Sequence, residues 1–109
     1  MGGRGEDENN MKAVDNITLA RWREMDAIVV LRFFADHIKQ DLSYHPTSSR
    51  QTRRWHVHVA GGDWEILCTG PKFWDTRSER GGGGAIDMTM HLYRLSFKAA
   101  VTLLLENGL

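Results

Sequence analysis

The chain has 109 residues, which is the size of one ordinary domain and too short for two. Basic and acidic residues balance at 14 each, so composition alone does not indicate a polyanionic partner. Hydrophobic residues make up 41%, which is enough for a core and excludes a chain disordered throughout. The longest apolar run, near residues 27–31, is far shorter than the ~20 residues of a membrane-spanning helix. Cys68 is the only cysteine, which excludes an internal disulfide and a zinc site with several cysteines.

The first residues are polar, contain glycine and show no periodicity. They predict a disordered N-terminal arm over residues 1–14, followed by a single folded domain over residues 15–109. The arm has no apolar segment of the kind found in secretory signal peptides. We therefore expect a cytoplasmic protein whose cysteine need not be oxidised.

The folded part begins with a helical pattern. Asp15 offers a carboxylate suited to capping a helix. Apolar residues then recur at intervals of three and four over residues 19–42, which predicts one amphipathic helix, or two with a break near residues 25–26. Proline, serine and threonine in residues 43–50 end the helix and predict a loop.

The middle of the chain changes to a period of two, which is typical of half-buried strands. Three alternating runs predict strands, and glycine-containing turns separate them. The strands cover residues 55–59, 64–69 and 72–75, and the turns lie at residues 61–63 and 70–71. This order predicts an antiparallel meander.

The last third predicts a polar, glycine-rich loop over residues 76–84 and a helix over residues 85–93. Ser96 is suited to cap a final helix over residues 97–106. The predicted fold is therefore α+β, with a small three-stranded antiparallel sheet, an N-terminal helix and two C-terminal helices. We expect the helices to lie on one face of the sheet.

Four consecutive glycines, Gly81–Gly84, allow two interpretations. In the first, the bare amides of Gly82 and Gly83 at a helix N-terminus bind a phosphate. In the second, the glycines form a flexible connector that permits a sharp turn into the helix. The chain lacks G-x-x-x-x-G-K-[ST], so we expect no Walker-type nucleotide site.

His56 and His58 lie two residues apart on one predicted strand, so both face the same side, away from Trp55 and Val57. Two histidines can begin a metal site, and His37, His45 and His91 are candidates for further ligands, but they do not stand at a recognisable spacing. An exposed sheet face is the simpler interpretation. Alternation places Cys68 in the core as a structural thiol. No cluster of carboxylates suits a metal-dependent polymerase or nuclease, and we expect no enzyme activity, cofactor or metal.

Basic residues flank the predicted strands and alternate with aromatic residues. Positive side chains bind phosphates and exposed rings stack on bases, so this combination favours nucleic acid. The alternative is that the rings belong to the core and the arginines only face solvent. We expect the contacts to converge at one edge of the sheet. The candidate residues are Arg53, Arg54, Lys72, Arg77, Arg80, Gly82 and Gly83.

Residues 72–101 resemble the end of the Cys-His-Cys-Cys zinc-binding domain of bacterial DNA primases. They are still more similar to a variant found at the N-terminus of plasmid and mobile-element proteins that carry a Toprim-type primase domain. The resemblance implies that the domain engages single-stranded or template DNA during replication while a separate domain, absent here, polymerises. The motifs that carry it are Lys72-Phe73-Trp74-Asp75, Gly81–Gly84, Ala85-Ile86-Asp87, Leu95-Ser96-Phe97 and Ala100-Val101.

The chain departs from the primase domain at the zinc ligands. By gap-free alignment the two downstream cysteines of that domain fall on Thr76 and Glu79, and the upstream cysteine and histidine fall near His56 and Val59. At most one of these positions keeps a competent ligand, whereas a structural zinc ion needs four. We therefore expect a degenerate, zinc-ribbon-like domain that binds no zinc.

Aromatic packing is the expected replacement for the metal, supplied by Trp55, Trp64 and Trp74. Phe73 and Trp74 are neighbours on one strand, so only one can face the core, and we expect it to be Trp74.

The leading interpretation is a non-catalytic nucleic-acid-binding domain that acts in replication or priming of a plasmid or mobile element. Its expected partners are single-stranded or template DNA and a Toprim primase, a helicase or another replication protein. The alternative is a module that docks on a replication protein. An enzyme that uses His56 and His58 is the weakest interpretation, and the sequence leaves open whether the chain is a piece of a longer primase.

Overall fold

A computed structural model describes residues 14–109, and the predicted N-terminal arm falls almost entirely outside them. Within the described residues, four helices and five strands follow one another. In chain order they are α2 (Asn16–Glu24), α3 (Ala27–Phe34), β1 (His37–Gln40), β2 (Arg53–Val59), β3 (Gly62–Thr69), β4 (Lys72–Asp75), β5 (Arg80–Gly83), α4 (Gly84–Tyr93) and α5 (Phe97–Glu106). None of these helices is long and apolar enough to cross a lipid bilayer.

The two C-terminal helices begin and end close to their predicted positions, whereas the N-terminal helical segment, predicted over residues 19–42, begins at Asn16 and already ends at Phe34. Asp15 caps α2 by accepting a hydrogen bond from the amide of Thr18 at 2.8 Å, and Ser96 caps α5 by accepting from the amide of Ala99 at 3.2 Å. Each cap gives a partner to an amide that the first helical turn leaves unsatisfied. The predicted break at residues 25–26 separates α2 from α3.

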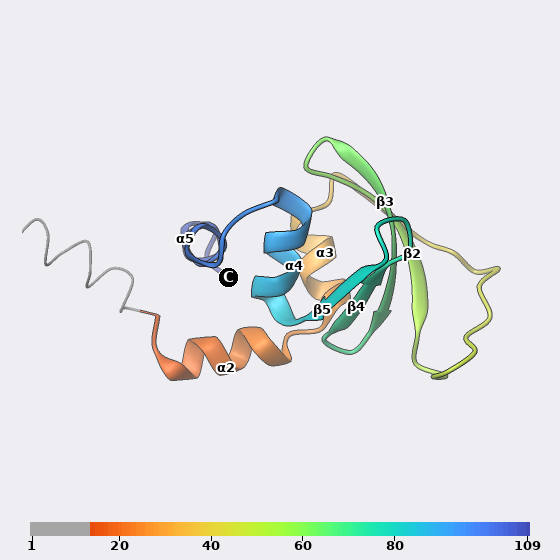
Figure 1. The fold of residues 1–109 in the computed structure, drawn as a ribbon, viewed down its shortest axis with the longest axis horizontal. Helices are drawn as coiled ribbons and strands as arrows, with labels where there is room; N and C mark the ends of the chain where they lie inside the picture. The colour runs from red at the N-terminus through yellow and green to blue at the C-terminus, as the bar shows by residue number, and fades with distance from the viewer. Residues whose placement is uncertain (1–13) are drawn as a thin grey trace, which may run out of the picture.

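The sheet has five antiparallel strands in the order β1-β2-β3-β4-β5. The prediction of a three-stranded sheet is therefore wrong, although the α+β class is correct. The three predicted strands are β2, β3 and β4, and the sequence analysis missed the two outer strands. All four helices lie on one side of the sheet, as Figure 1 shows.

β1 was missed because its residues continue the apolar spacing of the helix before them. α3 ends at Phe34, and the next residue leaves the helix in an extended conformation. Ile38 then pairs with Val57 of β2. Pairing with β2 therefore overrides the helical period that Ile38 and Leu42 suggest in the sequence.

β5 was predicted to be a loop, and its strand conformation depends on its lack of side chains. A Cβ atom on Gly81 would lie 2.6 Å from the carbonyl oxygen of Phe73 and 2.8 Å from the indole of Trp74. At Gly84, where α4 begins, φ is +85° and a Cβ atom would lie 2.8 Å from the carbonyl oxygen of Trp22. The glycines therefore permit close backbone contact, which a flexible connector would not require.

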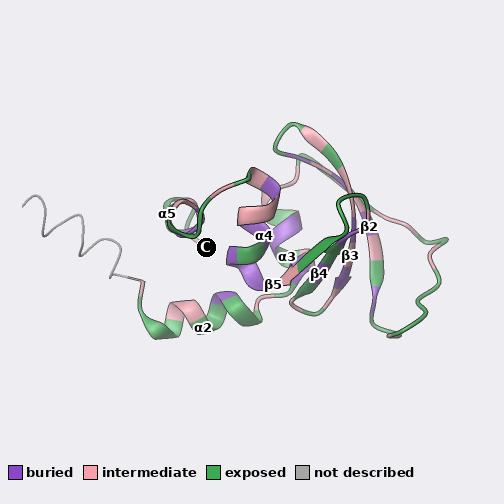
Figure 2. Cartoon of the chain, in the orientation of Figure 1, coloured by how far each residue is buried: buried purple, intermediate pink, exposed green. Residues whose placement is uncertain are grey.

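The core fills the space between the helices and the inner face of the sheet (Figure 2). Cys68 is part of it, as predicted, and burial raises the pKa of its thiol to about 12. The largest side chains that are fully buried come from both layers, and they are Trp22, Leu31, Ile66, Met88 and Leu104.

Phe73 points into the core and Trp74 points away from it, so the prediction for this pair is wrong. Phe73 is 5% exposed and Trp74 is 45% exposed. The register explains the difference, because Phe73 pairs with the buried Cys68 and the next residue must face the other way. Of the three tryptophans expected to replace a metal, Trp55 is buried, Trp64 is half-buried and Trp74 is exposed.

Candidate functional site

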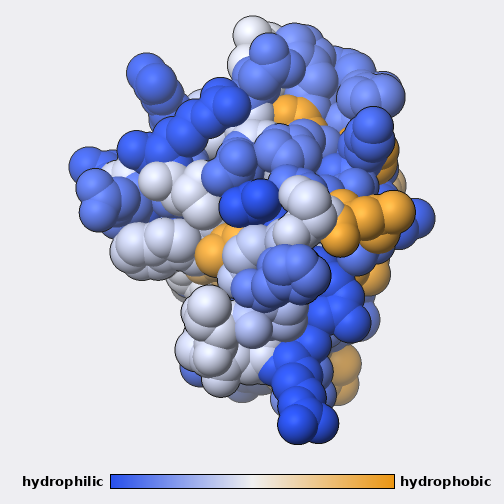
Figure 3. Space-filling model, turned by 90° about the vertical axis from the view of Figure 1, so that its right-hand side faces the viewer, coloured by the Kyte–Doolittle hydropathy of each residue, from blue (hydrophilic) through white to orange (hydrophobic). Residues whose placement is uncertain are grey.

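The face of the sheet that points away from the four described helices is called the open face here. Its outward side chains form rows because the register aligns them across neighbouring strands. Figure 3 shows this side of the molecule, where hydrophilic residues predominate and hydrophobic residues appear in small separate areas. The rows are His37-His58-Asp63, Lys39-His56-Glu65, Arg54-Leu67-Trp74-Gly81 and Thr69-Lys72-Gly83.

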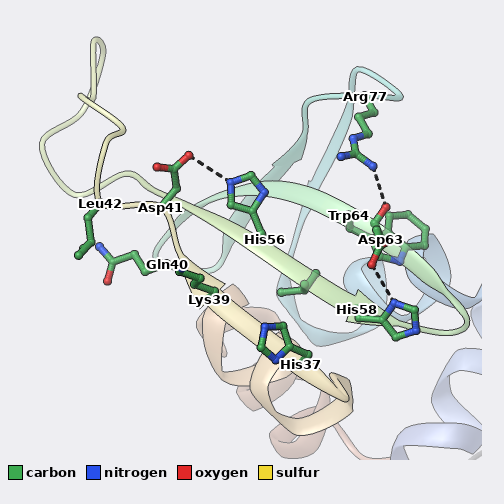
Figure 4. A pocket seen from close by; sticks show the side chains of 11 residues that line it. His37, Lys39, Gln40, Asp41, Leu42, His56, His58, Asp63, Trp64 and Arg77 are labelled. Carbon is green, nitrogen blue, oxygen red and sulfur yellow. Dashed lines mark hydrogen bonds and ion pairs between the residues drawn. The ribbon is translucent and has the colours of Figure 1, made fainter.

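A hollow of about 710 Å³ lies on the open face over β1, β2 and the start of β3. Figure 4 shows that its side chains come from these strands and from the turn between β4 and β5. Three histidines and two permanent cations line it, which are His37, His56, His58, Lys39 and Arg77. The predicted common face of His56 and His58 is confirmed.

Asp41, directly after β1, fixes one end of the hollow. Its Oδ2 accepts a hydrogen bond from Arg54 Nε at 2.9 Å and lies 3.1 Å from His56 Nε2. Its Oδ1 accepts a hydrogen bond from the amide of Ser43 at 2.9 Å. Hydrogen bonds from Ser43, His56 and Arg54 hold the pKa of Asp41 well below its usual range. Arg54 also lies over the ring of Tyr44 at 5.0 Å, so its guanidinium is committed to the protein.

Asp63 fixes the other end of the hollow. Its Oδ1 lies 2.8 Å from His58 Nδ1, and its backbone carbonyl accepts a hydrogen bond from Arg77 at 3.1 Å. The hydrogen bond and charge of His58, together with the charge of Arg77, lower the pKa of Asp63. The contact holds Arg77 at the edge of the hollow through one amino group. The other N–H groups of its guanidinium have no hydrogen-bond partner within residues 14–109.

Trp74 lies beside the hollow in the row that also contains Leu67 and Gly81. Its indole lies against the backbone of Gly81, at a distance that leaves no room for a side chain there. Lys72 is exposed in the next row. The open face therefore carries an exposed ring with a cation on either side of it, Lys72 at one end and Arg77 at the other.

The predicted basic residues do not converge at one edge of the sheet. Arg53, Arg54 and Lys72 lie where β2 and β4 begin, at the same end. Arg77 and Arg80 lie at the far end of β4, because β4 and β5 are antiparallel and the turn between them is on the opposite side from Lys72. Arg80 also pairs with the inward-facing end of β4, so it lies on the helix side of the sheet.

One of the two predicted glycine amides is already occupied. The amide of Gly83 donates a hydrogen bond to Asp87 Oδ2 at 3.0 Å. A Cβ atom at Gly82 would lie 3.0 Å from the same carboxylate. Asp87 of α4 therefore fills the position in which the sequence suggested a bound phosphate.

The positions that correspond to zinc ligands in the primase domain do not suit a metal. Val59 is buried and aliphatic, and His56 is bound to a carboxylate. Thr76 Oγ1 donates a hydrogen bond to Glu65 Oε1 at 2.7 Å, and Glu79 has a positive φ of 54° in the turn. Among residues 14–109, no three His, Cys, Asp or Glu side chains are grouped as a metal ion requires. Hydrogen bonds therefore shape the turn between β4 and β5, in which Thr76 and Glu79 lie.

Two groups of residues lie outside the binding sites predicted from the sequence. The first is His37 and Lys39 on β1; His37 was considered only as a further metal ligand, and the alternation of residues 37–40 could have indicated that both side chains share one face. The second is the pair of Asp75 and His91, whose Oδ2 and Nε2 atoms lie 2.7 Å apart. These residues are 16 positions apart, and no local pattern connects them.

No family model, curated protein or solved structure matches the chain. A sheet face that the described helices leave uncovered, with an exposed indole and separated cations, suits a flexible polyanion with unpaired bases, since the ring can stack on a base while the cations contact phosphates.

Proposed function

We propose that this chain is a non-catalytic nucleic-acid-binding domain that binds single-stranded or template DNA on its open face. The observation that carries the proposal is Trp74, a large aromatic ring that is 45% exposed on a sheet face that none of the four described helices covers. A ring of this size stabilises a fold most when it is buried, so its exposure costs stability. Stacking on an unpaired base supplies a reason for that exposure.

The surroundings of Trp74 support a stacking role. The ring is seated against Gly81 and beside Leu67, so neighbouring residues restrict its orientation. A ring that is already oriented loses little conformational entropy when a base stacks on it. Leu67 extends the apolar surface in the same row.

Charges on the open face support contact with phosphates. Lys39, Lys72 and Arg77 are exposed, and none of them has an ion-pair partner within residues 14–109. Strands lie about 4.8 Å apart, so the five strands present a surface about 19 Å wide, enough for several nucleotides. The aspartates bound to His56 and His58 limit the net positive charge, which favours moderate affinity at physiological salt.

The place of this activity in the cell is proposed from the sequence resemblance alone. The motifs of residues 72–101 resemble the zinc-binding domain of bacterial DNA primases, which suggests replication or priming of a plasmid or mobile element. A Toprim primase or a helicase, acting in the cytoplasm, would then supply the catalytic step. Zinc is not required for this role because the open face is formed by strand pairing.

The test is fluorescence anisotropy with a labelled single-stranded oligonucleotide. Replacement of Trp74 with alanine should weaken binding at least about fivefold, because one base–aromatic stack contributes about 1–3 kcal/mol. Lys72→Gln should reduce the slope of log affinity against log salt by about 0.7, the value for one phosphate contact on a single strand. The matched control is Phe97→Ala, since Phe97 is similarly exposed but lies on α5, on the helix side.

Equal losses in the Trp74 and Phe97 variants would contradict the proposed face. Absence of binding by the unmodified chain at about 50 mM salt, where electrostatic contacts are strong, would contradict nucleic-acid binding altogether. A protein-docking function would then be favoured by Val29 and Phe33, two exposed apolar residues one turn apart on α3.

A further inference from the structure

A second hollow, of about 770 Å³, lies on the helix side of the sheet beneath β5. It opens between the edge of β5 and the C-terminal half of α4. Aromatic and aliphatic side chains form its walls, and polar and charged groups lie at its base and rim. The walls are Trp64, Phe73, Met90 and Leu95, and the other side chains are Asp75, Ser78, Arg80, Asp87, His91 and Arg94.

The base of this hollow is a pair formed by Asp75 and His91. Their side chains are 4% and 15% exposed, and Asp75 Oδ2 lies 2.7 Å from His91 Nε2. Asp75 Oδ1 accepts hydrogen bonds from the amides of Arg77 and Ser78 at 3.0 and 3.3 Å. Both oxygens of this carboxylate therefore accept hydrogen bonds from the protein, and the pair is a fixed part of the fold.

His91 is held so that its second ring nitrogen is available. The rings of Trp64 and Phe73 lie 5.5 and 5.6 Å from the imidazole and set its plane. Its Nε2 is bound to Asp75, while Nδ1 has no hydrogen-bond partner within residues 14–109 and is not among the buried atoms left without one. Nδ1 is therefore accessible from the hollow. A ring that carries both protons has a hydrogen on Nδ1, which can donate a hydrogen bond to a ligand in the hollow.

Two arginines add positive charge at the rim. Arg80 begins β5, and Arg94 follows α4 with a left-handed φ of 55°, which turns the chain at this point. Of the two carboxylates that face the hollow, Asp75 is bound to His91 and Asp87 is bound to the amide of Gly83. The donors without a protein partner are therefore cationic, while both oxygens of Asp75 and one oxygen of Asp87 already accept hydrogen bonds from the protein.

We propose that this hollow binds a phosphoryl group, with His91 Nδ1 at its base and Arg80 and Arg94 at its rim as the donors. Phosphate oxygens accept hydrogen bonds from guanidinium and imidazolium groups with matching charge. The phosphoryl group can come from the 5′ end of a nucleic-acid strand or from a free phosphate monoester. The first source rests on the proposed function, whereas the second does not.

The experiment compares a 5′-phosphorylated oligonucleotide with the same strand carrying a 5′-hydroxyl group. The unmodified chain should bind the phosphorylated strand at least about tenfold more tightly, because several charged hydrogen bonds are gained. The double variant Arg80→Gln, Arg94→Asn should lose this preference, and asparagine is chosen since it tolerates the left-handed conformation. The matched control is Arg50→Gln, Lys98→Gln, which removes the same charge from two exposed positions outside the hollow.

A second arm records the imidazole signals by NMR while inorganic phosphate or AMP is added. Movement of the His91 signals without movement of those of His45, which is exposed in the loop after β1, supports a free phosphate monoester as the ligand. Tighter binding of the phosphorylated strand without such movement supports a strand end. The Trp74→Ala variant should weaken both strands equally, which separates failure of the open face from failure of this hollow. Equal affinity for both strands together with unmoved His91 signals would overturn the proposal.

Discussion

Two glycines of β5 provide a direct test of the fold, because they share a strand and a face but differ in surroundings. A Cβ atom on Gly81 would lie 2.6 Å from the carbonyl oxygen of Phe73, and backbone cannot yield without moving β5 away from β4. A Cβ atom on Gly83 meets only the carbonyl oxygen of Pro71, at the ordinary distance of 3.9 Å. The substitutions Gly81→Ala and Gly83→Ala should therefore differ sharply.

Gly81→Ala should lower the free energy of unfolding by about 1–3 kcal/mol, the usual cost of forcing extra atoms into a packed site. Gly83→Ala should change the free energy of unfolding by no more than about 0.5 kcal/mol. Removing backbone freedom from the unfolded chain stabilises by about 0.4–1 kcal/mol, and the loss of glycine at the N-cap of α4 offsets that gain.

Urea denaturation monitored by circular dichroism measures both differences. In a domain of about this size, each kcal/mol also shifts the melting temperature by about 4–8 °C. Equal stability of Gly81→Ala and the unmodified chain would refute the reasoning. It would mean that residues 80–83 form the open loop that the sequence alone suggested and do not pair closely with β4.

Three further predictions follow from burial and hydrogen bonding. Phe73→Ala should destabilise by about 3–5 kcal/mol and Trp74→Ala by less than half as much, and the reverse order in thermal melting would show the opposite register. Burial raises the pKa of Asp75, but hydrogen bonds from His91 and two amides outweigh it, so its pKa in the folded chain lies below the ordinary value of 3.8. The ionised carboxylate therefore stabilises the fold above about pH 4, and this stabilisation is lost as the pH falls through the folded pKa. The difference in free energy of unfolding between the unmodified chain and Asp75→Asn should shrink below about pH 4. A difference that stays constant with pH would contradict this link between protonation and stability. The thiol of Cys68, with its pKa raised to about 12 by burial, should react with a disulfide reagent at pH 8 only after denaturant is added; rapid reaction in the folded chain would show that it is accessible.

Local signals predicted the elements that local interactions determine. The cap residues Asp15 and Ser96 accept hydrogen bonds from their own first turns, so their sequence neighbourhood contains all the information needed. The alternation of residues 55–59 likewise predicted which side chains of β2 face the core. The alternation of β1 covers only four residues and is masked by the helical spacing before it, and β5 has no such signal. β1 continues a helical spacing, and β5 has only glycines after Arg80, so its strand conformation depends entirely on the neighbour that it pairs with.

In the candidate site, too, one part was predictable from the sequence and another was not. The residue types were predictable, since basic and aromatic residues are visible in the sequence. Their arrangement was not, because a shift of one residue in the register exchanges the two faces of a strand, as it did for Phe73 and Trp74. The pair of Asp75 and His91 joins a strand to a helix, and only the packing of α4 against the sheet brings the two side chains together.

The two proposed surfaces lie on opposite sides of β5, and they lie close together because β5 consists largely of glycine. Gly81 lies against the indole of Trp74 on the open face and also lines the hollow that contains His91 on the helix side. A strand of ordinary residues would separate these surfaces by the height of its side chains, whereas a glycine strand separates them by the backbone alone. β5 is also the last strand of the sheet, so its outer edge does not pair with another strand within residues 14–109. One nucleic-acid strand whose 5′ phosphate occupies the hollow can therefore pass around this edge and place a following base on Trp74. If both proposals hold, a phosphorylated mononucleotide will bind in the hollow without responding to Trp74→Ala, while longer strands will respond to changes at both sites.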